Sequence, residues 1–321
     1  SDGSKLLARL LGKSDRIESI VYATNSNMLV VVGGTPARFG EVQIWDTGTN
    51  KLIHSLKSTF DTIYGASLSP DNSFLAFGCT DETARIISVK DQKELVRFDN
   101  HSDWVLGTVF TTDGSHFVTG GRDTALKLTE VKSGSFVDDI NASNKGSGPI
   151  HKIARHPKLD QVLSGGEDRI PRLYRIFRQK RRDVGNTDFN LIRAFERQSD
   201  VINAVAFNPD GSQIAVGTVG GEVRIYKVAD GNRIATLGAD STAVFTIAFH
   251  PNKDQVAIGG FDGQVRIFNP NSGELIEEFI PVPLDSALTG IKVTEKVEVV
   301  KEKDNVVEAT TEIKLVVNGM T

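Results

Sequence analysis

The sequence is poor in the features that mark cross-linked, haem-bearing or membrane-spanning proteins. Its 321 residues include a single cysteine, Cys79, so an intrachain disulfide is impossible. No CxxC or CxxCH motif occurs, which excludes covalent c-type haem attachment to this chain. No apolar run approaches the ~20 residues that a membrane-spanning helix needs, and the first residues, Ser1–Lys5, do not resemble a signal peptide. The formal net charge of −4 provides no overall basic field that would attract nucleic acid.

What the sequence does have is a repeated apolar pattern. Thirty glycines against ten prolines suit many short strands joined by tight turns. A leucine or phenylalanine that ends a short β-like run recurs at Leu10, Leu56, Phe98, Phe195, Leu237 and Phe279. Twelve residues after each comes a second apolar position: Tyr22, Leu68, Phe110, Phe207, Phe249 and Ile291. A looser copy lies between Ile140 and Arg155. A period of about 40–45 residues is typical of the blades of a β-propeller.

One repeat, Val201–Leu237, shows four strand-like segments. We expect an inner strand over 201–207, a second over 213–217, a third over 222–226 and an outer strand over 233–237. The Asn-Pro-Asp-Gly turn at 208–211 separates the first two, because proline fixes φ and Asp-Gly tolerates left-handed backbone. Four short antiparallel strands per repeat would make one blade.

A turn residue stands six positions before the marker of each third strand. The third-strand markers are Trp45, Ile87, Thr129, Tyr174, Tyr226 and Phe268. Four repeats have aspartate at the turn position: Asp81, Asp123, Asp168 and Asp262. We expect these carboxylates to accept hydrogen bonds from turn amides and to hold the second and third strands in register.

These motifs resemble the WD40 family over roughly residues 5–280. The matching segments are Gln43–Asp46, Val223–Tyr226, Val265–Phe268, Ser69–Asp71 and Asn208–Gly211. The resemblance implies that His101 is the family histidine, with Asp123 as its partner and Thr129 in place of the usual tryptophan. It also implies a propeller that docks proteins on its narrower face. The loose motifs are similar to those of bacterial WD40 proteins.

The prediction for the fold is therefore all-β: one seven-bladed WD40-type β-propeller spanning residues 1–321. The predicted blades are approximately 16–56, 61–98, 103–140, 149–195, 201–237, 243–279, and 286–317 plus 5–11. The seventh is composite, since 5–11 match an outer strand and the C-terminal segment is strand-like. Such a blade would close the ring and remove two exposed sheet edges. The alternative is that 286–321 begins a separate β-sandwich or forms a linker strand.

The candidate docking face consists of turns between second and third strands and turns that lead into inner strands. Its candidate partner-binding residues are Arg38, Asp61, Asp103, Trp104, Arg122, His151, Arg169 and Phe261. Protein-binding patches favour tryptophan, tyrosine and arginine. The sequence leaves open whether Trp104 is an exposed anchor or packs between two blades.

A basic loop is the sharpest local charge feature. It comprises Arg178, Lys180, Arg181 and Arg182 within the run 172–182. We expect a solvated loop, and the alternative is a dock for an acidic or phosphate-bearing partner. The histidine spacing matches no metal motif, so no metal and no cofactor are predicted. Cys79 is predicted to be a small buried apolar residue.

The function predicted from the sequence is a non-catalytic protein–protein interaction scaffold within a larger bacterial multidomain protein. Its partner would be another protein or a neighbouring domain of the same polypeptide, with no membrane span and no nucleic acid. The alternative is a propeller enzyme that uses the central channel, for which Asp61, Asp103 and Asp168 are the available acids. The compartment stays open: a lone cysteine fits the cytoplasm but allows the periplasm of an exported bacterial protein.

Overall fold

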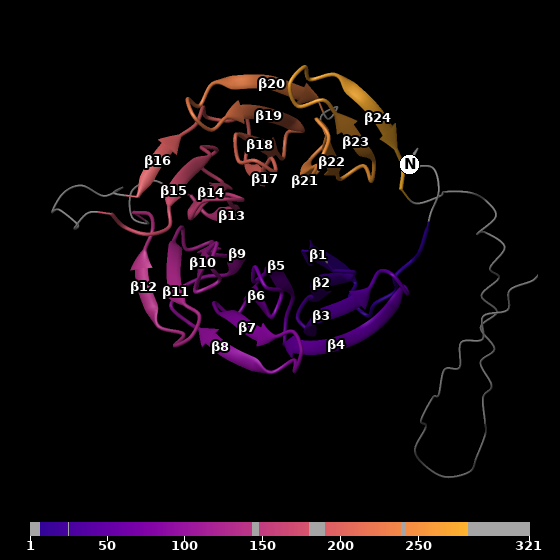
Figure 1. The fold of residues 1–321 in the computed structure, drawn as a ribbon, viewed down its shortest axis with the longest axis vertical. Coiled ribbons are helices and arrows are strands. Elements are labelled where there is room, and N and C mark those ends of the chain that lie inside the picture. The colour runs from indigo at the N-terminus through magenta and orange to yellow at the C-terminus, as the bar shows by residue number, and fades with distance from the viewer. Residues whose placement is uncertain (1–6, 25, 143–147, 180–189, 239–241, 282–321) are drawn as a thin grey trace, which may run out of the picture.

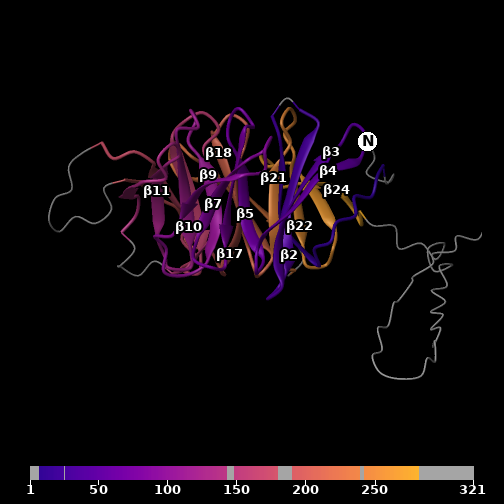
Figure 2. The same cartoon turned by 90° about the horizontal axis from the view of Figure 1, so that it is seen from below.

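Six four-stranded antiparallel sheets stand side by side around a central channel (Figure 1). The computed structural model describes residues 7–24, 26–142, 148–179, 190–238 and 242–281. Each sheet uses four consecutive strands, with the first beside the channel and the fourth at the rim. Seen from the side, the ring is a flat disc (Figure 2). This order is that of propeller blades.

The strands of the first three sheets follow one another without crossovers. The first sheet contains β1 (Arg16–Tyr22), β2 (Met28–Thr35), β3 (Phe39–Asp46) and β4 (Lys51–Thr59). The second contains β5 (Ile63–Leu68), β6 (Phe74–Cys79), β7 (Ala84–Ser88) and β8 (Glu94–Phe98). The third contains β9 (Val105–Phe110), β10 (His116–Gly121), β11 (Leu126–Glu130) and β12 (Phe136–Asp139).

The other three sheets repeat this order. The fourth sheet contains β13 (Ile150–Arg155), β14 (Gln161–Gly166), β15 (Arg172–Arg175) and β16 (Leu191–Ala194). The fifth contains β17 (Ile202–Phe207), β18 (Gln213–Thr218), β19 (Glu222–Lys227) and β20 (Arg233–Gly238). The sixth contains β21 (Val244–Phe249), β22 (Val256–Gly260), β23 (Val265–Phe268) and β24 (Leu275–Phe279).

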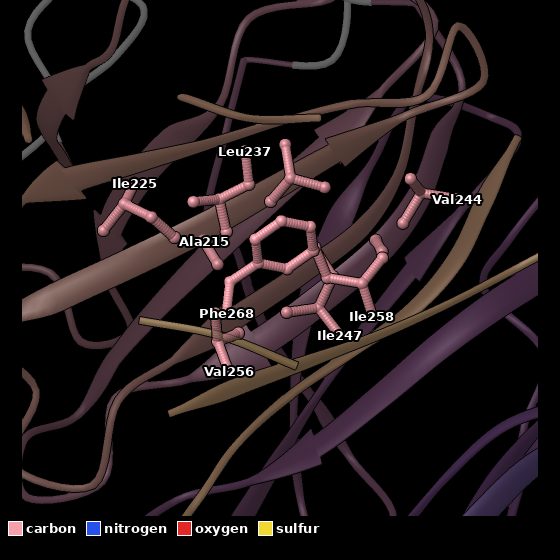
Figure 3. Close-up of a cluster of buried hydrophobic side chains, with 10 residues drawn as sticks. Ala215, Ile225, Leu237, Val244, Ile247, Val256, Ile258 and Phe268 are labelled. Carbon is pink, nitrogen blue, oxygen red and sulfur yellow. The ribbon is translucent and has the colours of Figure 1, made fainter. Parts of the chain in front are cut away.

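The hydrophobic core lies between neighbouring sheets. There are five clusters of buried apolar side chains, one between each pair of consecutive sheets from the first to the sixth. Between the fifth and sixth sheets, Phe268 packs with Ile225 and Leu237 (Figure 3). Each apolar Å² removed from water contributes about 25 cal/mol, so both faces of a sheet must be covered. That requirement fits the second strands of the first five sheets, which bury nearly every residue.

The first sheet has one side that shares no apolar cluster with another sheet among the described residues. On its side away from the second sheet, Leu29, Val31 and Trp45 form a small cluster against which Leu10 packs. Ile20 and Tyr22 of β1 are 60% and 67% exposed. Among the residues that the structure describes, no apolar cluster joins the sixth sheet to the first.

The prediction of seven blades was wrong, because the described residues form six. The predicted outer strand over 5–11 is absent from its described part, 7–11, which pairs with no strand. A single apolar match to the period does not make a strand, since a strand also needs a neighbour that accepts its backbone hydrogen bonds. The other part of that composite blade, 286–317, lies outside the described residues.

Residues 7–14, which we call the strap, instead lie along the first sheet and bond to Glu41. The Oε2 atom of this carboxylate accepts hydrogen bonds from Ser14 Oγ at 2.7 Å and from the Lys13 backbone N at 3.3 Å. Gln43 Nε2 also donates to Oε2 at 2.7 Å, and Ser55 Oγ donates to Oε1 at 2.5 Å. Burial acts to raise the pKa of Glu41, but these hydrogen bonds bring it below its ordinary value. The buried carboxylate therefore stays ionised and fixes the strap.

Candidate protein-interaction surface

All eight candidate partner-binding residues lie at one end of the sheets, which we call the upper face. Strands alternate in direction within each sheet, so the turns between second and third strands share this end with the links to the next sheet. The eight residues occupy these segments or the start of an inner strand: Arg38, Asp61, Asp103, Trp104, Arg122, His151, Arg169 and Phe261. The upper face therefore surrounds one mouth of the channel.

Trp104 is held in a stack that joins two sheets. Its ring lies 6.0 Å from that of Tyr64 on β5, with 18° between the planes. The Arg122 guanidinium lies 4.7 Å from the centre of the indole, and the Arg122 backbone N donates to the Trp104 carbonyl at 2.9 Å. Trp104 still keeps 37% of its surface exposed. Trp104 therefore packs against the second sheet and also faces solvent.

A second aromatic pair lies on the sixth sheet. Phe245 and Phe261 meet edge to face with 6.2 Å between ring centres. Their exposed fractions are 50% and 78%. Edge-to-face contact is a favoured aromatic geometry, so the two rings hold each other in place although water reaches both.

Polar contacts fix the loops between these two aromatic groups. His151 Nδ1 lies 3.3 Å from Asn203 Oδ1, and its Nε2 lies 3.6 Å from Glu167 Oε1. Arg169 has φ of 66°, and its carbonyl accepts the Gln198 backbone amide at 2.7 Å. Its side chain donates to the Ser199 carbonyl at 3.1 Å. The fourth and fifth sheets are thereby joined at the upper face.

The turn aspartates form the hydrogen bonds expected of their position. Asp81, Asp168 and Asp262 each accept a backbone amide two residues on. Each also pairs with an arginine four residues on: Asp81 with Arg85, Asp168 with Arg172, and Asp262 with Arg266. Bonding to Arg266 lowers the pKa of Asp262. These pairs brace each turn from within its own sheet.

Asp123 has a histidine partner instead of an arginine. His101 Nδ1 lies 2.8 Å from the Asp123 carboxylate, and its Nε2 lies 2.7 Å from Thr119 Oγ1. Since a carboxylate only accepts, Nδ1 is the donor to Asp123. Burial acts to raise the pKa of Asp123, but its bonds from His101 and from nearby backbone amides bring it below its ordinary value. The buried Thr129 hydroxyl has no hydrogen-bond partner among the described residues.

The three acids considered for catalysis hold loops. Asp61 accepts backbone amides from Ala37 at 3.0 Å and from Thr62 at 2.6 Å, and the first of these bonds is the main cause that lowers its pKa. Asp103 accepts the Trp104 amide at 2.7 Å, and Asp168 pairs with Arg172. Within the described ranges, no group of three or more His, Cys, Asp or Glu could hold a metal ion.

The basic loop is described only at its start. Arg178 forms an ion pair with Asp138 on β12, while Lys180, Arg181 and Arg182 lie outside the described residues. No helix in the described part of the chain is long and apolar enough to cross a membrane. Cys79 is fully buried, as predicted, and burial raises the pKa of its thiol to about 12.

Tyr64 and Phe245 complete the two aromatic groups, and sequence reasoning missed both. They occupy the second position of their inner strands, where β9, β13 and β17 have Leu106, His151 and Asn203. That position follows the first buried residue of each strand. Aligning the repeats on that buried residue could have identified it.

Comparison with known proteins places two repeats in a known family. Residues 50–88 and 92–129 match the family model described as WD domain, G-beta repeat. The chain contains WD repeats. Residues 175–252 match a second model, the anaphase-promoting complex subunit 4 WD40 domain. Each of the two matched segments ends within one residue of the end of a third strand, β7 in the first and β11 in the second.

Several longer proteins resemble the chain in part. WD repeat-containing protein 1 of Rattus norvegicus is 26% identical over 169 residues, which is 50% of this chain and 26% of that protein. Periodic tryptophan protein 2 of Arabidopsis thaliana is 22% identical over 242 residues, 63% of this chain and 26% of that protein. Actin-interacting protein 1 of Drosophila melanogaster is 25% identical over 161 residues, 50% of this chain and 26% of that protein. The chain thus spans about a quarter of the length of these relatives.

The WD repeats of this chain keep only parts of the family motif. Trp45 and Asp46 on β3 form its one Trp-Asp ending at a third strand. Asp46 Oδ1 accepts the Gly48 amide at 2.8 Å, so it begins the turn to β4. Trp45 Nε1 donates to Gln43 Oε1 at 3.0 Å. On β3, which precedes the matched segments, the tryptophan therefore bonds to a side chain of its own strand rather than to a histidine.

Proposed function

We propose that this WD-repeat protein is a non-catalytic scaffold that binds another protein through its upper face. The observation that supports this most directly is the Tyr64–Trp104–Arg122 stack, which exposes a tryptophan and an arginine beside the channel mouth. Tryptophan, tyrosine and arginine supply most binding energy at protein interfaces.

The order of these side chains before binding favours affinity. A partner that immobilises a free side chain loses about 0.5–1.5 kcal/mol for each one. Here the Trp104 ring already packs on Tyr64, and Arg122 is tied to the same loop through its backbone. Most of that loss has therefore already occurred on folding.

The relatives suggest a first partner. The name of the Drosophila protein states that it interacts with actin, so actin is the first candidate. A neighbouring domain of the same polypeptide remains the other candidate. The relatives named above come from a rat, a plant and a fly. They give no support to a bacterial origin, which stays a prediction.

The proposal is tested with the double variant Trp104→Ala, Arg122→Ala. We expect it to weaken binding by about thirtyfold, because hot-spot truncations cost about 2 kcal/mol or more. The measurements are co-sedimentation with filamentous actin and affinity capture with identification of retained proteins. The control is Leu275→Ala, Ile276→Ala on β24, which removes two half-exposed side chains from the rim.

Each outcome discriminates. Partners retained by wild type and by the β24 control, but lost with the stack variant, support the upper face. If the stack variant, folded by circular dichroism, retains every partner, the proposed face is wrong. Binding of actin by wild type but not by the stack variant would identify the partner.

A further inference from the structure

The opposite end of the ring, which we call the lower face, carries a cavity that the proposed function does not use. Its volume is about 280 Å³, near the size of small-ligand sites. It lies against the inner strands of the first four sheets. Its apolar walls include Tyr22, Leu68, Val109, Phe110 and Ile153.

Arg155, at the end of β13, is the only charged residue in the lining of this cavity. Its Nη1 donates to the carbonyls of His156 at 3.0 Å and Pro157 at 3.4 Å. No carboxylate of the described residues forms an ion pair with it. Asp160, whose charge acts on Arg155, accepts the Thr112 amide and hydroxyl at 2.8 and 2.9 Å instead.

The guanidinium of Arg155 is partly buried without an ion pair among the described residues, which is unfavourable for a charged group. Burial lowers the pKa of Arg155, an effect that Asp160 only opposes, so the guanidinium is partly withdrawn from water. A desolvated charge is unfavourable unless it is paired. An anion bound in the cavity would supply the missing pair.

The other polar groups of the lining are occupied with each other. The hydroxyls of Ser67 and Thr108 lie 3.1 Å apart. Asn72 Nδ2 donates to the Thr24 carbonyl at 2.9 Å, and Asn72 Oδ1 accepts the Thr24 amide at 3.2 Å. A ligand would therefore meet apolar walls and one cation, with few other polar groups to satisfy.

We propose that this cavity binds a ligand with one carboxylate on an apolar body, held by Arg155 and packed against Tyr22, Leu68 and Phe110. Two sources share that chemistry: a free aliphatic acid, and the C-terminal carboxylate of a peptide that ends in apolar residues. Guanidinium–carboxylate hydrogen bonds fix the charged end, and apolar burial supplies the rest.

The test is isothermal titration of the full chain with matched probes. Octanoate is compared with octanamide, and N-acetyl-Phe-Leu with its C-terminal amide. We expect wild type to prefer the acid of at least one pair by about tenfold or more, the worth of a hydrogen bond to a charged group. The pair that shows the preference identifies the source.

Three variants assign the preference to Arg155. Arg155→Gln should abolish it, while Arg155→Lys keeps the charge and should retain part of it, which separates lost charge from lost folding. Thr24→Trp should weaken acid and amide alike, since it adds bulk to the lining while its bonds to Asn72 use only the backbone. The control is Lys253→Gln, which removes one charge from the exposed turn between β21 and β22.

The proposal is overturned if wild type shows no preference for either acid. It is equally overturned if Arg155→Gln leaves the preference intact, or if Lys253→Gln reduces it as much. These outcomes concern the lower face alone. The proposal that the upper face binds a protein is therefore tested independently.

Discussion

Replacing Asp123 with alanine should destabilise the protein by about 3 kcal/mol. The Asp123 carboxylate accepts hydrogen bonds from His101 Nδ1 at 2.8 Å and from the backbone amides of Ser102 and Ala125 at 3.2 Å. The side chains of His101 and Asp123 are 0% and 7% exposed. A hydrogen bond to a charged group contributes about 1.5–3 kcal/mol, and a buried donor left unpaired adds a further cost of about 1–3 kcal/mol.

The assay is urea denaturation followed by tryptophan fluorescence at pH 7. Asp103→Ala is the matched control, because Asp103 lies in the same loop and keeps 38% of its side chain exposed. We expect the control to lose less, about 1 kcal/mol, because its exposed carboxylate gives up only the bond from the Trp104 amide. Thr119 still bonds to His101 in both variants, so the difference isolates the carboxylate.

The same pair of proteins gives a prediction for pH. The pKa of Asp123 is lower in the folded state than its ordinary value, so its stabilisation is fully present above the unfolded pKa of about 3.9. It is lost as pH falls through the folded pKa. The Asp123 contribution to the free-energy gap between wild type and Asp123→Ala should thus shrink as pH falls below about 4. A gap at pH 7 no larger than that of Asp103→Ala would refute the reasoning.

Three further changes test other parts of the structure. Thr129→Val removes a buried hydroxyl that lacks a partner among the described residues. Urea denaturation should therefore show an unchanged free energy of unfolding or a gain of up to about 1 kcal/mol. A clear loss of stability would show that the hydroxyl has a hydrogen-bond partner. Gly211→Ala should cost about 2 kcal/mol or more, because φ is +81° and the new Cβ would lie 2.2 Å from the His156 ring. Gly263→Ala has φ of +73° but open space, so about 1 kcal/mol is expected in the same assay, and equal losses would contradict the steric argument. Cys79, with a pKa of about 12, should react with Ellman's reagent at pH 8 only after unfolding; rapid reaction of the native protein would count against its burial.

The strands within a repeat could be predicted from the sequence. The four segments expected over 201–237 correspond to β17, β18, β19 and β20 within one residue at each end. The alternation of apolar side chains and the Asn-Pro-Asp-Gly turn are local signals, so a short window of sequence contains them. The number of sheets was wrong, because closure depends on pairing between distant segments and the match at Leu10 carried no information about its partner.

The candidate site was predictable only in part. The upper face followed from the order of strands, which places equivalent turns at one end. The Tyr64–Trp104 stack did not, because it joins side chains of two sheets across 40 positions of sequence. The Arg155 cavity is of the same kind, since its walls come from four inner strands and its arginine forms no ion pair among the described residues.

The strap gives the molecule a weak point with a definite chemical identity. Elsewhere each sheet is retained by many apolar contacts that would have to be lost together. The side-chain anchoring of residues 13–14, by contrast, converges on the Glu41 carboxylate. Local opening requires little free energy where few contacts are broken, so this segment can detach while all six sheets stay intact. Leu29, Val31 and Trp45 would then meet water without any unfolding of the ring.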